Sequence, residues 1–162
     1  MQILVLTGDA PTVAAKVAKD LGILAEVSPT IQPSSTPTVN GVITGSALAA
    51  LSADKGKFNA AILGNVVFAK LSPHLKLQIV EALRSQGRTV AFLGDGVNDA
   101  MALRGADVGI SVHSGTEIAK DAADVILLEK SLGVIADGVL LGRITCDNFM
   151  RALFALAHNI DP

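Results

Sequence analysis

The sequence predicts an α/β fold in which helices pack on a mostly parallel sheet, and three features support this. In residues 89–99, an apolar run typical of a buried strand ends in Gly94-Asp95-Gly96, and a helix is expected over 99–104. Residues 1–21 repeat the order of strand, polar turn and helix. Half of the 162 residues are apolar but only 3% are aromatic, so Ala, Val, Leu and Ile must build the core.

The turn after the strand over 89–93 carries the strongest sign of chemistry. Asp95, Asn98 and Asp99 follow the strand closely, at the edge of a parallel sheet where ligands bind. Two carboxylates held close together repel each other unless a cation neutralises them. A small hard cation with oxygen ligands, Mg²⁺ completed by a phosphate, suits this turn.

Two other interpretations of this turn remain open from the residues alone. Asn98 or Asp99 could simply cap the helix that follows a Gly-Asp turn. Gly94 and Gly96 also begin a dinucleotide-binding pattern, but the third glycine position holds Asp99, and Asp95 would face a pyrophosphate with like charge.

The N-terminal unit predicts a second polar turn at the same edge of the sheet. A strand over 1–6 leads into Thr7-Gly8-Asp9, and a helix is expected over 10–21 with Asp9 as its cap. Its expected apolar stripe comprises Val13, Val17 and Leu21. The Thr7 hydroxyl and the Gly8 N–H could bind a phosphate, although a plain cap and turn is the simpler interpretation.

The remaining elements follow from periodicity and turn residues. Residues 28–40 are rich in Pro, Ser and Thr and predict a loop. Further strands are expected over 41–44, within 60–69, over 107–112 and over 124–128. Further helices are expected over 46–51, 72–86, 114–121 and 132–157, with a polar turn over 54–57.

The helix over 72–86 has the clearest signals. Ser72 caps it, and its buried stripe is expected to comprise Leu75, Ile79, Val80 and Leu83. Lys76 lies near its N-terminal end, where the helix dipole favours anions, so it could share a bound anion. A solvated surface lysine is the simpler expectation from spacing alone.

Composition narrows the class of partner and compartment. A net charge of −2 gives no electrostatic case for nucleic acid. The single cysteine, Cys146, excludes an internal disulfide and fits a reducing compartment. The chain shows no signal peptide and no apolar run of about 18 residues, so we expect it to be cytoplasmic. The broad apolar face over 132–157 could be core, or a stalk without its partner.

The residues also carry a resemblance to a known family. It rests on LTGD followed by APTVAAKVAKDLGI, on FAKLSPHLKLQIVEALRSQGRTVAFLGDGVNDAMALRGADVGISV, on EIAKDAADVILLEKSL and on GRIT. In this order they resemble the C-terminal half of the phosphorylation domain of P-type cation-transporting ATPases, most closely the magnesium-transporting group. The resemblance covers nearly all of the chain except the Pro-rich stretch.

The resemblance implies a Rossmann-like, haloacid-dehalogenase-type three-layer sandwich. Residues 1–162 would be one partial phosphorylation domain, with 133–158 a stalk-like helical region. The chain would then lie in the cytoplasmic portion of a membrane transporter.

The resemblance also implies one phosphoryl-transfer site. Asp95 would bind Mg²⁺ directly, and Asp99 would support the ion or its waters. Thr7, the Gly8 N–H and Asn98 would hold phosphoryl oxygens, and Lys76 would offset the charge in flight. Asp9 would shape its loop, and Met101 departs from the proline usual in the family.

The largest departure is the family's nucleophile, an Asp in Asp-Lys-Thr-Gly-Thr, because that motif is absent from the sequence. In the family its strand lies between those that match 2–6 and 89–93, so we expect an altered sheet or self-association. Phosphate or ATP would then be bound through the missing segments of a larger pump. Two alternatives remain: a stand-alone phosphohydrolase with a displaced nucleophile, such as Asp9, and a non-catalytic remnant that binds a partner.

Overall fold

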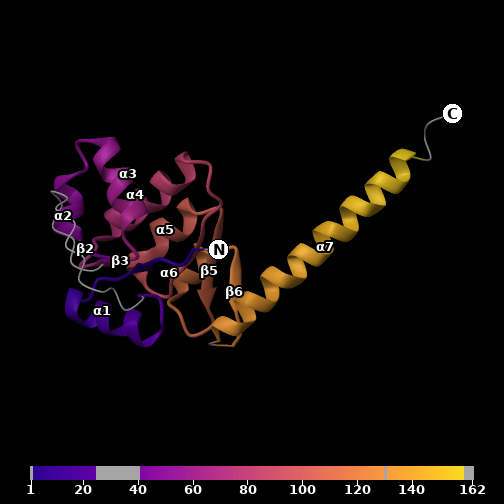
Figure 1. The fold of residues 1–162 in the computed structure, drawn as a ribbon. Coiled ribbons are helices and arrows are strands. Elements are labelled where there is room, and N and C mark those ends of the chain that lie inside the picture. Colours follow the sequence, from indigo (N-terminus) through magenta and orange to yellow (C-terminus); the bar gives the residue numbers. More distant parts are fainter. Residues whose placement is uncertain (1, 25–40, 130, 159–162) are drawn as a thin grey trace.

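The structure is a computed structural model that describes residues 2–24, 41–129 and 131–158, so the loop expected over 28–40 lies outside the described residues. Strands and helices largely alternate along the chain (Figure 1). The strands are β1 (Val5–Leu6), β2 (Val42–Thr44), β3 (Val67–Ala69), β4 (Ala91–Leu93), β5 (Val108–Val112) and β6 (Val125–Leu127). The helices are α1 (Pro11–Asp20), α2 (Gly45–Ala50), α3 (Lys55–Gly64), α4 (Pro73–Ser85), the 3-10 turn η1 (Val97–Asp99), α5 (Ala100–Gly105), α6 (Glu117–Asp121) and α7 (Leu132–His158).

The strands form two parallel three-stranded sheets. One has the order β1-β3-β2, with Val67 of β3 opposite Val5 and Val42. The other has the order β4-β5-β6, with Ala91 opposite Val108 and Ile110 opposite Val125. Parallel neighbours need crossover connections, which α5 supplies between β4 and β5 and α6 supplies between β5 and β6. Helix α4 instead joins one sheet to the other, from β3 to β4. The predicted α/β class with parallel strands is therefore confirmed.

The two sheets meet at β1 and β4, which are each the outer strand of their sheet. Within the described ranges no ladder joins them, and the contact between the two parts is made by side chains: Arg88 Nη1 donates to Gln2 Oε1 (2.8 Å), and Leu6 packs against the cluster that contains Phe92. The backbone edges of β1 and β4 are thus left without strand partners. This division lies where the sequence predicted a missing strand.

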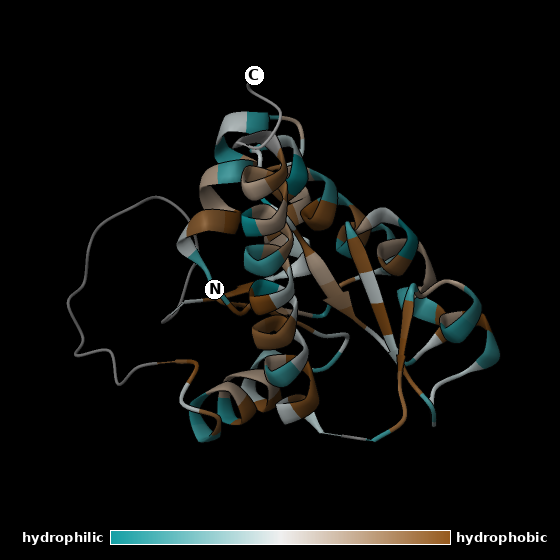
Figure 2. Ribbon diagram, turned by 90° about the vertical axis from the view of Figure 1, so that its right-hand side faces the viewer, coloured by the Kyte–Doolittle hydropathy of each residue, from teal (hydrophilic) through white to brown (hydrophobic). Residues whose placement is uncertain are grey.

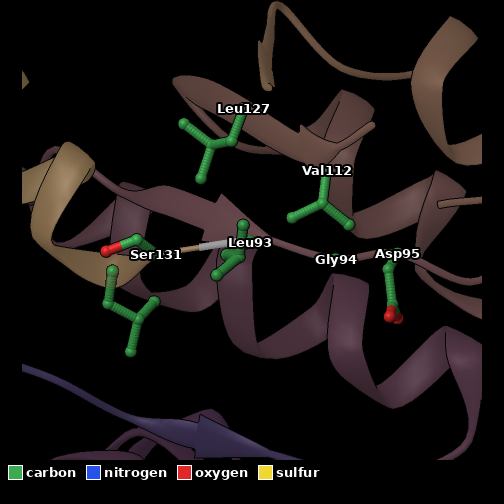
Figure 3. Close-up of a pocket in the computed structure, with 7 residues that line it drawn as sticks. Leu93, Gly94, Asp95, Val112, Leu127 and Ser131 are labelled. Carbon is green, nitrogen blue, oxygen red and sulfur yellow. The ribbon is translucent and has the colours of Figure 1, made fainter. Parts of the chain in front are cut away.

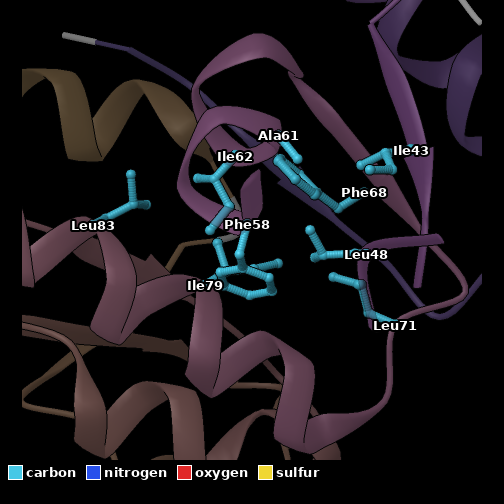
Figure 4. Close-up of a cluster of buried hydrophobic side chains, with 9 residues drawn as sticks. All are labelled: Ile43, Leu48, Phe58, Ala61, Ile62, Phe68, Leu71, Ile79 and Leu83. Atoms are coloured by element: carbon cyan, nitrogen blue, oxygen red, sulfur yellow. The ribbon is translucent and has the colours of Figure 1, made fainter. Parts of the chain in front are cut away.

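Helix α4 connects the two halves of the core. Its Ile79 and Leu83 belong to the larger cluster, which Figure 4 shows gathered between helices and strands. Its Val80 belongs to the second cluster, with Phe92 of β4 and Leu103 of α5. Burying a side chain of this size contributes about 1.5–3 kcal/mol, so α4 holds both halves in place. The members of the larger cluster are Ile43, Leu48, Phe58, Ala61, Ile62, Phe68, Leu71, Ile79 and Leu83.

Helix α1 forms as predicted, but its predicted buried stripe is wrong. Val13, Val17 and Leu21 are 51%, 46% and 60% exposed, whereas Ala14 and Ala18 are buried beside β3. Small alanine side chains allow the helix to approach the sheet closely, which turns the larger residues outward. The predicted cap is also wrong, because the N-cap is Ala10, which makes no side-chain capping hydrogen bond.

Residues 54–66 also differ from the prediction. The expected turn over 54–57 is the start of α3, where Asp54 Oδ1 accepts hydrogen bonds from the N–H groups of Gly56 (3.0 Å) and Lys57 (3.2 Å). The strand expected within 60–69 is confined to β3. Phe58, Ala61 and Ile62 are buried at helical spacing, which is the signal the sequence analysis missed.

Helix α7 extends away from the rest of the fold (Figure 1). Its first turns contact the sheet through Ile135, which packs against the cluster of Ile110, Val112 and Leu127. Apolar and polar residues both occur along it, whereas the strands are mostly apolar (Figure 2). Its large exposed apolar residues are Leu132, Val134, Val139, Leu140, Leu141, Ile144, Phe149, Met150, Leu153, Phe154 and Leu156. Among the helices of the described ranges, none is long and apolar enough to span a membrane.

Asp107 fixes the start of β4 and is expected to make stability pH-dependent. Its pKa lies below the ordinary 3.8, first because the Val90 N–H donates to its carboxylate (2.8 Å) and also because Arg84 pairs with it. A lowered pKa in the folded state stabilises the fold above pH 3.8, and this stabilisation is lost as the pH falls through the folded pKa. We expect Asp107→Asn to lower the free energy of unfolding at pH 7. When the pH is then lowered below 3.8, the variant should lose less stability than the wild type does. Urea unfolding of both proteins at the two pH values would measure this. Equal pH dependence in the two proteins would contradict this.

Candidate functional site

The turn after β4 is tightly built around Gly94. The Gly94 N–H donates to Ile110 O (3.0 Å), which continues the pairing with β5. A Cβ on Gly94 would lie 2.5 Å from the Cβ of Asp99, so only glycine allows Asp99 to fold back over the turn. The Gly96 N–H donates to Asp99 Oδ2 (3.3 Å). Asp99 is buried as a result, whereas Asp95 and Asn98 are exposed.

Lys76 and Asp99 form a buried ion pair. Lys76 Nζ lies 2.6 Å from Asp99 Oδ1, and the two residues are only 8% and 9% exposed. A solvated Lys76, the simpler expectation from spacing, is therefore wrong. Lys76, Val80 and Leu83 share one face of α4 at the i, i+4, i+7 spacing, and that spacing could have indicated burial.

The Thr7 turn is held by β3 and by the segment between β3 and α4. The Thr7 N–H donates to Phe68 O (2.9 Å), and Thr7 O accepts from Leu71 N–H (3.0 Å). The Thr7 hydroxyl donates to Asp9 Oδ2 (2.9 Å) and accepts from the Asp9 N–H (3.1 Å). Gly8 is exposed, with nothing within 4 Å of where its Cβ would be. A ligand could therefore approach the Gly8 backbone without obstruction.

The structure brings the predicted residues together in two groups. Lys76, Asp95, Asn98 and Asp99 belong to the turn after β4 and to the helix facing it, and the Thr7 turn lies at the end of β1. Within the described part of the chain, no hydrogen bond or ion pair joins the two groups directly. Residues 71–76 contact both, because Leu71 bonds to Thr7 and Lys76 bonds to Asp99.

A pocket of about 310 Å³ opens beside Asp95 (Figure 3). Its floor comes from the ends of β4, β5 and β6, and the segment entering α7 closes one side. Its lining residues are Leu93, Gly94, Asp95, Val112, Leu127, Ser131 and Leu132. Asp95 is the one charged residue in this lining, so the pocket is an apolar surface with an acidic rim.

The donor atoms suit a divalent cation only in part. The Asp95 carboxylate makes no hydrogen bond or ion pair within the described ranges, so its oxygens are available to a hard cation. Both Asp99 oxygens already accept hydrogen bonds, from Lys76 and Gly96. No group of three or more His, Cys, Asp or Glu side chains that could hold a metal occurs in residues 2–24, 41–129 and 131–158. A cation here would take one direct protein oxygen, from Asp95, and complete its shell with water or phosphate.

Two residues that the sequence analysis did not single out also contact this turn. The Thr116 N–H donates to Asp95 O (2.9 Å), and Gly115 lies against the same carbonyl. Both follow β5, so they reach the same edge of the sheet as Asp95. The polar run Ser114-Gly115-Thr116 after an apolar strand was the signal available in the sequence.

The fold is thus a parallel α/β fold with an acidic turn after β4 and a hydroxyl turn after β1. The model of the haloacid dehalogenase-like hydrolase family matches residues 1–107. The chain belongs to this family.

The curated relatives that this chain resembles are P-type cation-transporting ATPases. The magnesium-transporting ATPase, P-type 1, of Salmonella typhimurium is 42% identical over 149 residues, which are 92% of this chain. The protein of the same name from Escherichia coli is 42% identical over 91% of the chain, and the probable cation-transporting ATPase F of Mycobacterium bovis is 41% identical over 90%. The chain spans about 15% of the length of each of these relatives.

A solved structure supports the same assignment. The catalytic domain of the CPx-ATPase CopB-B superposes on this chain with a TM-score of 0.56 and 27% identity. The match covers 83% of this chain and 37% of that one. The predicted family resemblance is therefore confirmed.

Proposed function

We propose that this chain is part of the phosphorylation domain of a P-type ATPase, a pump that couples Mg²⁺-dependent ATP hydrolysis through an aspartyl phosphate to cation transport. One observation carries the proposal: the turn after β4 holds both the exposed Asp95 and the Asp99 carboxylate, which is buried in an ion pair with Lys76. A buried pair of this kind is costly to desolvate, and groups held in this way are common at functional sites.

In this proposal each residue has one electrostatic or positioning task. Asp95 binds Mg²⁺ directly, and Asp99, held by Lys76, orients its waters. The Gly8 N–H, Thr7 and Asn98 hold oxygens of the phosphoryl group. Mg²⁺ held there would supply charge neutralisation for the transferring phosphoryl group, and Lys76 would offset more of that charge, which is what phosphoryl transfer demands of a protein.

The partner in this proposal is the remainder of the pump. The open edges of β1 and β4 suit a strand supplied from elsewhere. The exposed helix α7 suits a stalk over 133–158 attached to one partial domain, 1–162. Such a domain would lie on the cytoplasmic side of the membrane, with ATP bound through other segments. Self-association across the open edges would be the alternative for the isolated chain.

The proposal predicts that the isolated chain forms no phospho-enzyme, because it has no Asp-Lys-Thr-Gly-Thr motif. Incubation with Mg²⁺ and acetyl phosphate should leave its mass unchanged. Supplying a segment with an apolar strand followed by Asp-Lys-Thr-Gly-Thr should yield an adduct on that segment, detected by mass spectrometry and removed by hydroxylamine. Asp95→Asn should abolish the adduct.

Each alternative outcome of this experiment is informative. A hydroxylamine-sensitive adduct on the isolated chain would contradict the inactive fragment and indicate a displaced nucleophile, with Asp9 the first residue to substitute. If the supplied segment binds but never becomes phosphorylated, the chain is a partner-binding module and the proposed transfer site is wrong.

A further inference from the structure

The backbone of Asp95 is held on both sides while its side chain remains unengaged. The preceding N–H, of Gly94, donates to Ile110 O in β5 (3.0 Å). The Asp95 carbonyl accepts the Thr116 N–H (2.9 Å). The carboxylate has no hydrogen-bond partner within the described ranges, and the residue is exposed. A fixed backbone below a free carboxylate is what a preorganised ligand requires.

Gly115 makes the second contact with this carbonyl. A Cβ at Gly115 would lie 3.2 Å from Asp95 O, 3.0 Å from Val112 O and 3.0 Å from Ser111 Oγ. Ser111 is fully buried on β5, and the Val112 O accepts the Gly115 N–H (2.8 Å), so neither neighbour moves freely. A methyl group at this position would therefore require Asp95 O, Val112 O or Ser111 Oγ to shift by a few tenths of an ångström.

The loop that makes both contacts is itself anchored. Thr116 Oγ1 accepts the Ala119 N–H (3.3 Å) and caps α6. Ala119 is fully buried in the cluster that contains Phe92 of β4. The loop between β5 and α6 is thus fixed to the same core as the strand that ends at Asp95.

We propose that Gly115 and Thr116 are positioning residues, which set the direction of the Asp95 carboxylate for a divalent cation. The inference rests on the proposed assignment of Asp95 as the direct metal ligand. Substitution of residues that orient a metal ligand typically lowers metal affinity about 10- to 100-fold. Gly115 faces the backbone carbonyl of Asp95 and not its carboxylate. For Gly115→Ala we therefore expect the lower end of this range, about 10-fold weaker binding.

The test is a titration with Mn²⁺ alone, followed by electron paramagnetic resonance, on the wild-type chain, Gly115→Ala and Asp95→Asn. Gly138→Ala is the matched control, because nothing lies within 4 Å of where a Cβ on Gly138 would be. Asp95→Asn should lose the bound signal, Gly115→Ala should weaken it about 10-fold, and Gly138→Ala should match the wild type. Gly115→Ala should melt at a lower temperature than wild type because its neighbours must shift, so the titration is made well below that temperature, where the variant is folded. The χ1 rotamer populations of Asp95, measured by NMR couplings, should change in Gly115→Ala alone.

The outcomes separate this inference from the proposed function. Mn²⁺ binding that is equal in Gly115→Ala and wild type, or unchanged χ1 populations, would overturn the positioning role and leave Asp95 as a ligand. Absent binding in the wild type, or binding that persists in Asp95→Asn, would overturn the metal assignment itself. If Gly115→Ala does not fold, Thr116→Gly takes its place, because it loosens the loop without adding atoms. Thr116→Gly should also bind Mn²⁺ more weakly than the wild type. Wild-type Mn²⁺ affinity in that variant would contradict the inference.

Discussion

Replacing Lys76 by Met is expected to lower the free energy of unfolding by about 3–5 kcal/mol. The substitution keeps most of the side-chain volume but leaves the Asp99 carboxylate, 9% exposed, without its cation. The Gly96 N–H would remain as its one hydrogen-bond donor. An unpaired charge in this position must either draw water into the core or take up a proton. Urea unfolding followed by circular dichroism would measure the loss.

Two further variants show whether burial of the Lys76–Asp99 pair causes the loss of stability in Lys76→Met. Lys57 pairs with Asp54 at 3.5 Å on the surface and is 71% exposed, so Lys57→Met should change the free energy by less than about 0.5 kcal/mol. The double variant Lys76→Met/Asp99→Leu should be less destabilised than Lys76→Met, because no buried charge remains. A loss for Lys76→Met no larger than for Lys57→Met would mean that Asp99 is reached by solvent.

The elements with strong local signals were predictable from the sequence. Residues 72–86 had a cap, a proline in the first turn and an apolar stripe, and α4 begins and ends within one residue of the prediction. In α3, by contrast, Gly56 and Asn59 within an apolar segment obscured a helix that tertiary burial of Phe58 and Ile62 stabilises. The face of α1 that packs on the sheet was not predictable, because close packing favoured the alanines of the helix over its valines.

The residues of the candidate site were easier to predict from the sequence than their arrangement in space. Sequence order placed Asp95 and Asp99 after one strand and Thr7 after another, and parallel strands bring such ends to one edge. The pairing of Lys76 with Asp99 depends on how α4 packs across the turn, over a separation of 23 residues, which no local pattern encodes. The contact of Thr116 with Asp95 depends in the same way on the pairing of β4 with β5.

Replacing Gly94 by Ala is expected to lower the free energy of unfolding by about 1–3 kcal/mol. The added methyl would lie 2.5 Å from Asp99 Cβ and 2.9 Å from Asp99 Cγ, too close for either group to remain in place. Asp99 cannot simply rotate away, because its Oδ1 is bound to Lys76. Urea unfolding should show the loss, and Gly64→Ala, with nothing within 4 Å of where its Cβ would be, should show none.

A double-mutant cycle with Asp99 identifies the obstacle. If the clash with Asp99 causes the loss, Gly94→Ala should cost much less in a chain that already carries Asp99→Gly, because no Cβ is left to collide with it. Equal cost in both backgrounds would instead place the strain in the backbone of the turn. The cycle therefore shows whether glycine is required at position 94 because the Asp99 carboxylate folds back over it. That arrangement pairs Asp99 with Lys76 and leaves Asp95 exposed.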